Sequence, residues 1–491
     1  MLILMRRVWF VSILLISLSV LSACPGGEEA EAPSQVKPTP SPPHGGPEQA
    51  ATSQTQSPAV AGGTQEPLES SATDAFGGER DLPELDGETA TGEADSEELD
   101  ARVAAWREDL EVLAEELPRR HKNLYFELAP ARFMAAVDLL REDIPYLDDH
   151  EIIVHLMRLV AMPGDSHTAL DINSSGFHAF PLQLYWFEDG LFVIGTDARY
   201  ADALGLRLSA IDGVDIEEAI GHVSTVFPYE NYAQLTKQAP SFLVLAEVLH
   251  TIGVTAQIES AEFTFTDDYA EESFNLTIEA VAAVNHDTWM HALDPIDPSL
   301  PVYLEQQFNP YFCKYLPDLR MLFLQYNGCV ERSDLPFADF VGLVDEMVVT
   351  YEFEYFVIDL RFNSGGDSSI ADPLIDYIAG QPEVNQRGTL FVVIGRNTFS
   401  SAVLNALAFQ RETEALLAGE PTGGKPNHFG EVQAFTLPNS GMDVYYSTKY
   451  FTPSDSDDDS LMPDIPAVEF SSDYFSYVDP AIDAILDFTA Q

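Results

Sequence analysis

The stretch TLFVVIGRNTFSS, residues 389–401, decides how this chain folds. Its apolar run from Leu390 to Ile394 predicts a buried parallel strand, because such strands carry apolar residues on both faces. Gly395 to Phe399 predict a short loop, and Ser401 to about Arg411 predict a helix. Ser400 therefore lies at a turn between a strand and a helix.

The hydroxyl of Ser400 has two interpretations. It could be a helix N-cap that accepts hydrogen bonds from the first helical turn. It could instead be an exposed nucleophile, because the free N–H groups at a helix start, including that of Ser401, can stabilise a negatively charged oxygen. Acyl transfer needs both a nucleophile and such donors. The local sequence leaves both interpretations open.

A glycine pair follows the neighbouring strand. Tyr355 to Arg361 form a second buried run and lead into Asn363-Ser364-Gly365-Gly366, while Ala415 to Ala418 form a strand after the helix. Alternating strands and helices predict a parallel α/β sheet, in which loops after the carboxyl ends of strands share one edge. We therefore expect the loop with Gly365 and Gly366 beside Ser400. Its glycines could expose N–H groups to a ligand, or form an ordinary turn.

The first 24 residues predict a bacterial lipoprotein signal peptide. Arg6 and Arg7 precede an apolar run from Val8 to Leu21, which ends in Leu21-Ser22-Ala23-Cys24. Cys24 would become the lipidated residue; the alternatives are an uncleaved anchor or a cysteine there by chance. Pro25 after Cys24 resembles the pattern of outer-membrane lipoproteins. We expect an extracytoplasmic protein that is lipid-anchored to a bacterial membrane.

Residues 25–98 predict an unstructured acidic tether, because Pro, Gly, Ser, Thr, Ala and Glu dominate and large apolar residues are almost absent. The whole chain has 24 basic and 80 acidic residues and a formal net charge of −56. This charge argues against nucleic acid as a partner. After the signal peptide, no apolar run is long enough to span a bilayer.

Three folded regions are predicted after the tether. Residues 99–172 show three helical patterns and a loop that carries Ser166 and His167. Residues 173–300 read as short strands that resemble a PDZ-like module, although a plain β-rich region is the alternative. A helix is expected there from Phe242 to Leu249, after Pro240. Residues 301–491 form the α/β core.

Metal and disulfide signals are weak. Cys313 and Cys329 could form a disulfide, yet a hairpin about Pro317-Asp318 would place their sulfurs at different heights. A disulfide and two free thiols are therefore both left open. No zinc motif is present, and the acidic loop Asp455 to Asp459 lacks the pattern of a calcium loop. We expect no metal and no cofactor.

Four motifs in order, GDSHT, YFVIDLRFNSGG, TFSSA and GEPTGGK, resemble the serine peptidase family of the tail-specific (carboxyl-terminal processing) proteases and the tricorn core protease. The resemblance covers about 99–491. It implies a ClpP/crotonase-like α/β catalytic core, preceded here by the helical domain and the PDZ-like segment. It also implies hydrolysis of peptide bonds in a polypeptide substrate, with Ser400 as the nucleophile and Gly365, Gly366 and Ser401 around the oxyanion.

Two residues compete for the role of general base. By resemblance, Lys425 stands 25 positions after Ser400, as the lysine base of the processing proteases does, whereas Ser166-His167 match the pair of the tricorn branch. Val403 and the TGGK sequence depart from the processing-protease pattern. Lysine needs burial to lower its pKa, which acidic surroundings oppose, whereas histidine needs little adjustment. We therefore favour His167, with Ser166 orienting it.

The sequence thus predicts a lipid-anchored extracytoplasmic serine endopeptidase. The alternative is a non-catalytic protein of the same scaffold that binds a peptide or an apolar ligand, since a fold does not fix a function. The carboxylate that orients His167 is left open between Asp165 and Glu431. The oligomeric state is also left open.

Overall fold

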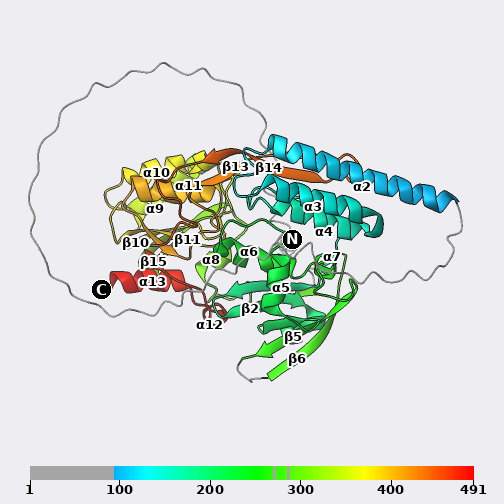
Figure 1. Ribbon diagram of the computed structural model, residues 1–491. Coiled ribbons are helices and arrows are strands. Elements are labelled where there is room, and N and C mark those ends of the chain that lie inside the picture. The colour runs from blue at the N-terminus through cyan, green and yellow to red at the C-terminus, as the bar shows by residue number, and fades with distance from the viewer. Residues whose placement is uncertain (1–92, 269–271, 283, 285–287, 491) are drawn as a thin grey trace, which may run out of the picture. The chain divides into compact units, whose positions relative to one another are not determined.

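The computed structural model describes residues 93–268, 272–282, 284 and 288–490, and all of these belong to one compact unit (Figure 1). The predicted signal peptide, Cys24 and residues 25–92 of the predicted tether lie outside the described residues. The last part of the predicted tether is helical, because helix α2 begins at Glu93.

The core is a six-stranded sheet in the order β15-β12-β11-β10-β9-β8. All neighbouring strands are parallel except β8, which pairs antiparallel with β9. The strands are β8 (Tyr311–Leu316), β9 (Met321–Tyr326), β10 (Tyr355–Asp359), β11 (Leu390–Ile394), β12 (Leu416–Gly419) and β15 (Ile465–Pro466). The buried runs that the sequence shows are therefore the central parallel strands, and the predicted α/β core is confirmed.

Helices cover both faces of this sheet, as Figure 1 shows. Apolar residues of α9 (Phe337–Thr350), α10 (Asp372–Ala379) and α11 (Ser401–Glu412) form one core layer with it. Short α8 (Val302–Glu305) and the C-terminal α13 (Pro480–Thr489) form the layer on the other face. Helix α13 follows Asp479, whose side chain accepts a hydrogen bond from the amide of Ala481.

The region before the core contains a seven-stranded sheet in which β1-β2-β3-β5-β6 are adjacent in that order. Its strands are β1 (Leu182–Phe187), β2 (Gly190–Asp197), β3 (Arg207–Ile211), β4 (Val214–Asp215), β5 (Ser260–Asp267), β6 (Glu272–Glu279) and β7 (Trp289–His291). This region is β-rich, as expected. Its PDZ-like character stays a prediction.

The helix expected from Phe242 to Leu249 is confirmed only in part, because the non-helical residues 243–245 divide this stretch between two helices. Three helices accompany the β-rich sheet: α5 (Ile216–Val223), α6 (Tyr232–Phe242) and α7 (Ala246–Thr251). Pro240 lies inside α6, near its end, where the missing amide costs only one late hydrogen bond. Helix α6 begins after Asn231, whose side-chain oxygen accepts a hydrogen bond from the amide of Gln234.

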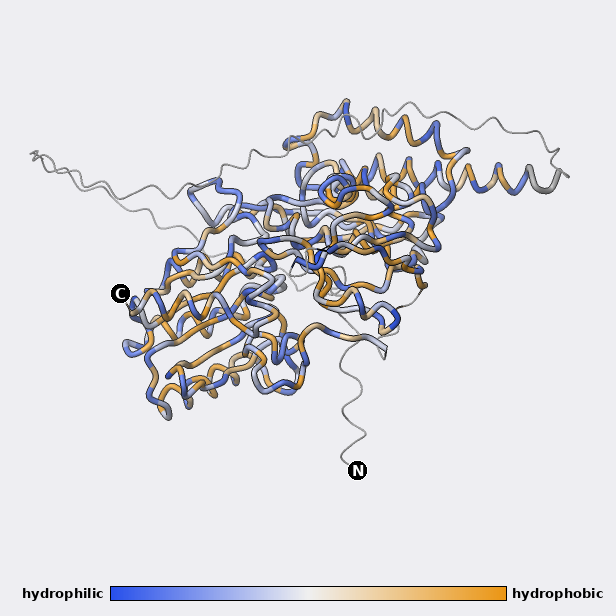
Figure 2. Tube along the Cα trace, turned by 90° about the horizontal axis from the view of Figure 1, so that it is seen from below, coloured by the Kyte–Doolittle hydropathy of each residue, from blue (hydrophilic) through white to orange (hydrophobic). Residues whose placement is uncertain are grey.

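The N-terminal helices α2 (Glu93–Arg120), α3 (Pro130–Asp143) and α4 (Asp149–Ala161) agree with the three helical patterns. Figure 2 shows hydrophobic and hydrophilic residues interleaved along α2. The buried positions of this helix include Leu110, Leu113 and Leu117. The long hairpin β13 (His428–Thr436) and β14 (Asp443–Phe451) packs against α2. Buried Asp109 joins the two by accepting from the amides of Asn439 and Ser440, 2.8 Å each.

Cys313 and Cys329 are separate thiols. Cys313 pairs with Leu324 across the β8–β9 hairpin, whereas Cys329 follows the end of β9, so the hairpin separates them as the sequence suggests. Among the residues that the structure describes, no helix has the length and apolar composition needed to cross a membrane.

Candidate active site

Ser400 occupies a strained turn between β11 and α11. Its backbone has φ +51° and ψ −125°, which is uncommon for a residue with a side chain. It holds the N-cap position, yet its hydroxyl makes no capping hydrogen bond. Such strain costs on the order of 1–3 kcal/mol and persists only where the surroundings enforce it. The interpretation of Ser400 as a hydrogen-bonded cap is therefore wrong.

Thr398 holds the loop before this turn. Its buried hydroxyl donates to the carbonyl of Leu360, 2.9 Å away, and accepts from the amide of Gly395 at 3.0 Å. The amide of Phe399 donates to the carbonyl of Asn363, 3.1 Å away. These bonds connect the loops after β10 and β11, so the neighbourhood expected for the glycine pair and the serine turn is confirmed.

Gly365 lies directly against Ser400, and Gly366 lies against Cys329. A Cβ atom on Gly365, whose φ is +109°, would lie 2.8 Å from the Ser400 Cβ and 3.1 Å from the Ser401 nitrogen. Gly366 has φ +129°, and a Cβ there would lie 2.2 Å from the carbonyl oxygen of Cys329. Both positions therefore require glycine, for conformation and for space.

Two main-chain amides beside Ser400 remain available for a ligand. The N–H of Gly365 donates to the Asn363 side chain, 2.9 Å away, so it is already used. Within the described part of the chain, the N–H groups of Gly366 and Ser401 make no hydrogen bond. The Ser401 hydroxyl donates to the carbonyl of Gly366, 2.6 Å away, and so ties the two residues together. Of the three expected oxyanion residues, Gly366 and Ser401 have free donors.

The TGGK loop closes the other side of the turn. A Cβ on Gly423 would lie 2.1 Å from the Arg396 carbonyl oxygen, and one on Gly424 would lie 3.2 Å from the Ser400 nitrogen. The Gly424 amide donates to the carbonyl of Thr398, 3.2 Å away. The departure of this loop from the processing-protease sequence thus has a packing reason.

His167 contacts Phe399, the residue directly before Ser400 in the chain. Their rings stack with centroids 4.5 Å apart, and the ring of His428 lies on a parallel plane 5.8 Å from His167. His167 is 5% exposed. Among the described residues, neither of its ring nitrogens has a hydrogen-bond partner. Buried nitrogens without a hydrogen-bond partner are costly, so this ring is a candidate to bind a polar group of a ligand.

Burial lowers the pKa of His167 to about 4, with a further lowering from His428, while the Asp165 carboxylate opposes both. The ring is therefore neutral near pH 7 and able to accept a proton. Its Nδ1 lies 3.8 Å from Asp165 Oδ1. Of the two carboxylates that the sequence left open, Asp165 is the one beside His167. Glu431 is exposed.

A network that the sequence did not suggest fixes Asp165. His121 Nε2 donates to this carboxylate at 2.9 Å, and His121 Nδ1 accepts from the amide of Asn123, which defines the tautomer. The Thr168 hydroxyl and the His167 amide also donate to Asp165, at 2.6 and 3.0 Å. Burial alone would raise the pKa of Asp165, but the His121 bond and the field of His167 lower it to about 2.

Ser166 points to a different partner. Its hydroxyl donates to the Gln234 side chain, and its amide contacts the Glu230 carboxyl at 3.4 Å. Burial and the Asp165 charge raise the pKa of Glu230 to about 8, so this group is protonated at neutral pH. Gln234 lies in the first turn of α6 and Glu230 lies just before this helix. The contact joins distant segments, and the sequence gave no signal for it.

Lys425 is engaged by an acidic residue. Its Nζ lies 2.8 Å from Asp459 Oδ1. Burial lowers the pKa of Lys425, but the hydrogen bond to Asp459, the charge of Asp459 and the charge of Glu127 outweigh this, so the net shift is upward. The ammonium is thus stabilised as a cation. Its counter-ion, Asp459, belongs to the acidic loop Asp455 to Asp459.

Asp165, His167 and Glu230 offer ligand atoms within 4.8 Å of one another, a spacing at which three groups could hold a cation. The donor set nevertheless fits a metal poorly. The oxygens of Asp165 already accept from three partners, and Glu230 holds its proton at neutral pH.

Comparisons with known proteins concern the family and the fold. Residues 337–467 match the model of Peptidase family S41. Mature CPAF complexed with lactacystin is similar in structure, with a TM-score of 0.54 and 11% identity over 79% of this chain and 98% of that one. This likeness concerns the fold alone.

Two further solved structures are less similar. The tricorn protease has a TM-score of 0.38 and 14% identity over 80% of this chain and 37% of that one. The photosystem II D1 C-terminal processing protease has a TM-score of 0.33 and 13% identity over 74% and 92%. No curated protein matches the chain in sequence.

Proposed function

We propose that this chain, whose residues 337–467 match the model of Peptidase family S41, is a serine peptidase of that family that hydrolyses polypeptides with Ser400 as the nucleophile and His167 as the general base. The observation that carries the proposal is the strained Ser400 turn, which lacks a capping bond and adjoins two unused amides. These are the parts that acyl transfer needs.

In the proposed reaction the Ser400 oxygen attacks the scissile carbonyl carbon while His167 takes the hydroxyl proton. The N–H groups of Gly366 and Ser401 donate to the oxyanion. His167 then gives the proton to the leaving amine, so that the peptide C–N bond breaks and an acyl-enzyme remains. A water molecule, deprotonated by His167, releases the carboxylic acid and restores Ser400.

Electrostatics favour His167 over Lys425 as the base. A base must be unprotonated, and His167, with a pKa lowered to about 4, is so at neutral pH. The pKa of Lys425 is raised, and its Nζ already binds Asp459. Asp165, beside His167 Nδ1, would stabilise the imidazolium that forms. The bond of Ser166 to Gln234 makes it a residue that positions the loop.

The experiment is hydrolysis of a denatured protein by the purified full chain. Ser400→Ala should lower kcat by about 10⁴-fold or more, because no other group replaces the nucleophile. Ser224→Ala, at the end of helix α5, is the matched control and should keep the wild-type rate. Equal cleavage by wild type and Ser400→Ala would refute the proposed nucleophile and favour a binding protein of the same fold.

The choice of base has its own test. His167→Ala should abolish the pH-dependent step of kcat/KM, whereas Lys425→Ala should retain the wild-type pH profile. Near wild-type activity of His167→Ala would exclude histidine as the base.

For localisation we propose a lipid anchor at Cys24, on the support of the signal-like sequence before it. Cys24→Ser should move the protein from the membrane fraction to the soluble fraction of the producing bacterium. Unchanged membrane association of this variant would refute the anchor. The substrate would be an extracytoplasmic polypeptide.

A further inference from the structure

A cavity of about 150 Å³ lies beside the Ser400 loop. Its walls come from strands β1 and β2, from the second half of α6, and from the loop residues Arg396 and Asn397. This volume is large enough for one amino-acid side chain or a short chain end. Most of the lining is apolar, with Leu182, Ile194 and Pro240 among its residues.

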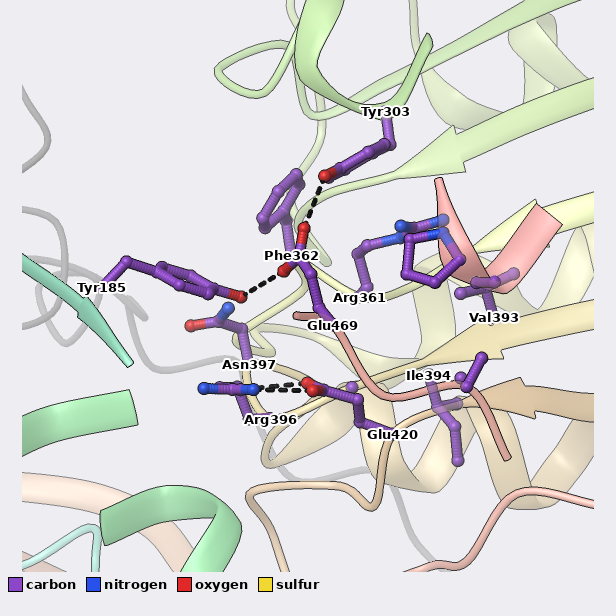
Figure 3. A pocket seen from close by; sticks show the side chains of 15 residues that line it. Tyr185, Tyr303, Arg361, Phe362, Val393, Ile394, Arg396, Asn397, Glu420 and Glu469 are labelled. Carbon is purple, nitrogen blue, oxygen red and sulfur yellow. Dashed lines mark hydrogen bonds and ion pairs between the residues drawn. The ribbon is translucent and has the colours of Figure 1, made fainter. Parts of the chain in front are cut away.

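The cavity contains an unneutralised cation. Lys237 lines it and forms no ion pair among the described residues, although its Nζ lies over the aromatic ring of Phe399. Arg396, the other basic residue of the lining, is neutralised by two hydrogen bonds to Glu420. Figure 3 shows this pair in a second, smaller pocket, which Arg396 also lines. No acidic residue lines the cavity. In a chain with 80 acidic residues, this is a local positive site.

Burying the Lys237 ammonium without a counter-ion costs free energy. Burial lowers the pKa of Lys237 to about 8, because no counter-ion offsets the desolvation of the ammonium. A bound carboxylate would remove this cost and add charge-assisted hydrogen bonds.

Lys237 also lies close to the proposed nucleophile. Its Nζ is 6.0 Å from the ring centroid of Phe399, the residue directly before Ser400. This contact, together with the lining residues Arg396 and Asn397 of the same loop, places the cavity beside the turn that carries Ser400, so an occupant of the cavity would lie near the scissile bond. The cavity is thus placed to select the residue that flanks this bond.

We propose that Lys237 is a specificity-determining residue that binds a carboxylate of the substrate in this cavity. The carboxylate is either the side chain of Asp or Glu next to the scissile bond or the free carboxyl terminus of the cleaved chain. The inference rests on the proposed function, because it assigns the cavity to the same polypeptide substrate. Apolar walls would hold the aliphatic part of the residue.

The test uses matched peptides and the full chain. One pair differs only by Glu or Gln beside the cleavage site, and the other pair only by a free or amidated C-terminus. Wild type should prefer the acidic member of one pair by about tenfold or more in kcat/KM, as expected for a hydrogen bond between charged groups. The preferred pair identifies the source of the carboxylate.

Lys237→Met should reduce that preference to about one, chiefly through KM, and Lys237→Glu should favour a peptide with Lys at the same place. Lys314→Met, whose amine pairs with Glu305 on an exposed part of β8, is the matched control and should retain the preference. Equal hydrolysis of both members of both pairs by wild type would overturn the inference, as would an equal loss on all peptides in Lys237→Met.

Binding to Ser400→Ala separates this inference from the proposed function. If no peptide is cleaved by wild type, the proposed function fails. Tighter binding of the acidic member of a pair by Ser400→Ala, lost in the double variant with Lys237→Met, would still support the carboxylate site. Equal binding of both members of both pairs would refute it.

Discussion

Replacing Gly365 by alanine tests whether the glycine loop sets the geometry of the site. The new Cβ would lie 2.8 Å from the Ser400 Cβ, whereas unbonded carbons need about 3.5 Å, so the two loops must separate by about 0.7 Å. The φ of +109° adds strain of about 1–3 kcal/mol.

The expected effect on activity follows from this displacement. A shift of about 1 Å in a reacting group can reduce the rate about 100-fold, so we expect kcat/KM on a peptide to fall by about that factor. This corresponds to about 2.7 kcal/mol of lost transition-state stabilisation. The free energy of unfolding should fall by about 1–3 kcal/mol, measured by denaturant titration.

Gly388→Ala is the matched control. Gly388 also has a positive φ, +88°, but nothing lies within 4 Å of a Cβ built on it. This variant should lose similar stability and keep its activity within about twofold of wild type. The reasoning would be refuted if Gly365→Ala and Gly388→Ala, both folded, hydrolysed the peptide at the same rate.

Three further predictions concern buried charges. Because the pKa of His167 is lowered to about 4, kcat/KM should hold its plateau down to about pH 5 and fall below it; a midpoint near 6.5 would contradict this role. The pKa of Glu230 is about 8 in the folded protein, above the usual value of 4.5, so the free energy of unfolding should fall as pH rises from about 5 to about 8. Glu230→Gln, which cannot ionise, should gain stability relative to wild type over this pH range in thermal melts. Asp109→Ala should lower the free energy of unfolding by about 2–4 kcal/mol, because it leaves the amides of Asn439 and Ser440 without an acceptor; an unchanged midpoint would show that water replaces the carboxylate.

The sequence was most informative where a single segment determines its own structure. The apolar runs before Asn363 and Gly395 had to be buried strands, and their alternation with helices required a parallel sheet that brings the two following loops to one edge. Local caps such as Asp479 were also predictable, since the side chain and the amides that it binds are adjacent.

Distant contacts were not predictable in this way. The competition between His167 and Lys425 was open in the sequence, because Asp459 neutralises the lysine and burial against Phe399 sets the pKa of the histidine. The bond between Ser166 and Gln234 likewise joins segments with no common pattern.

The sequence by itself determined the sheet, the serine turn and the family resemblance, because short-range periodicity and chain order encode them. Only the tertiary structure decided the environment of each ionisable group, including the unpaired Lys237 beside the Ser400 loop. The physical reason is that desolvation and charge depend on which distant residues pack together.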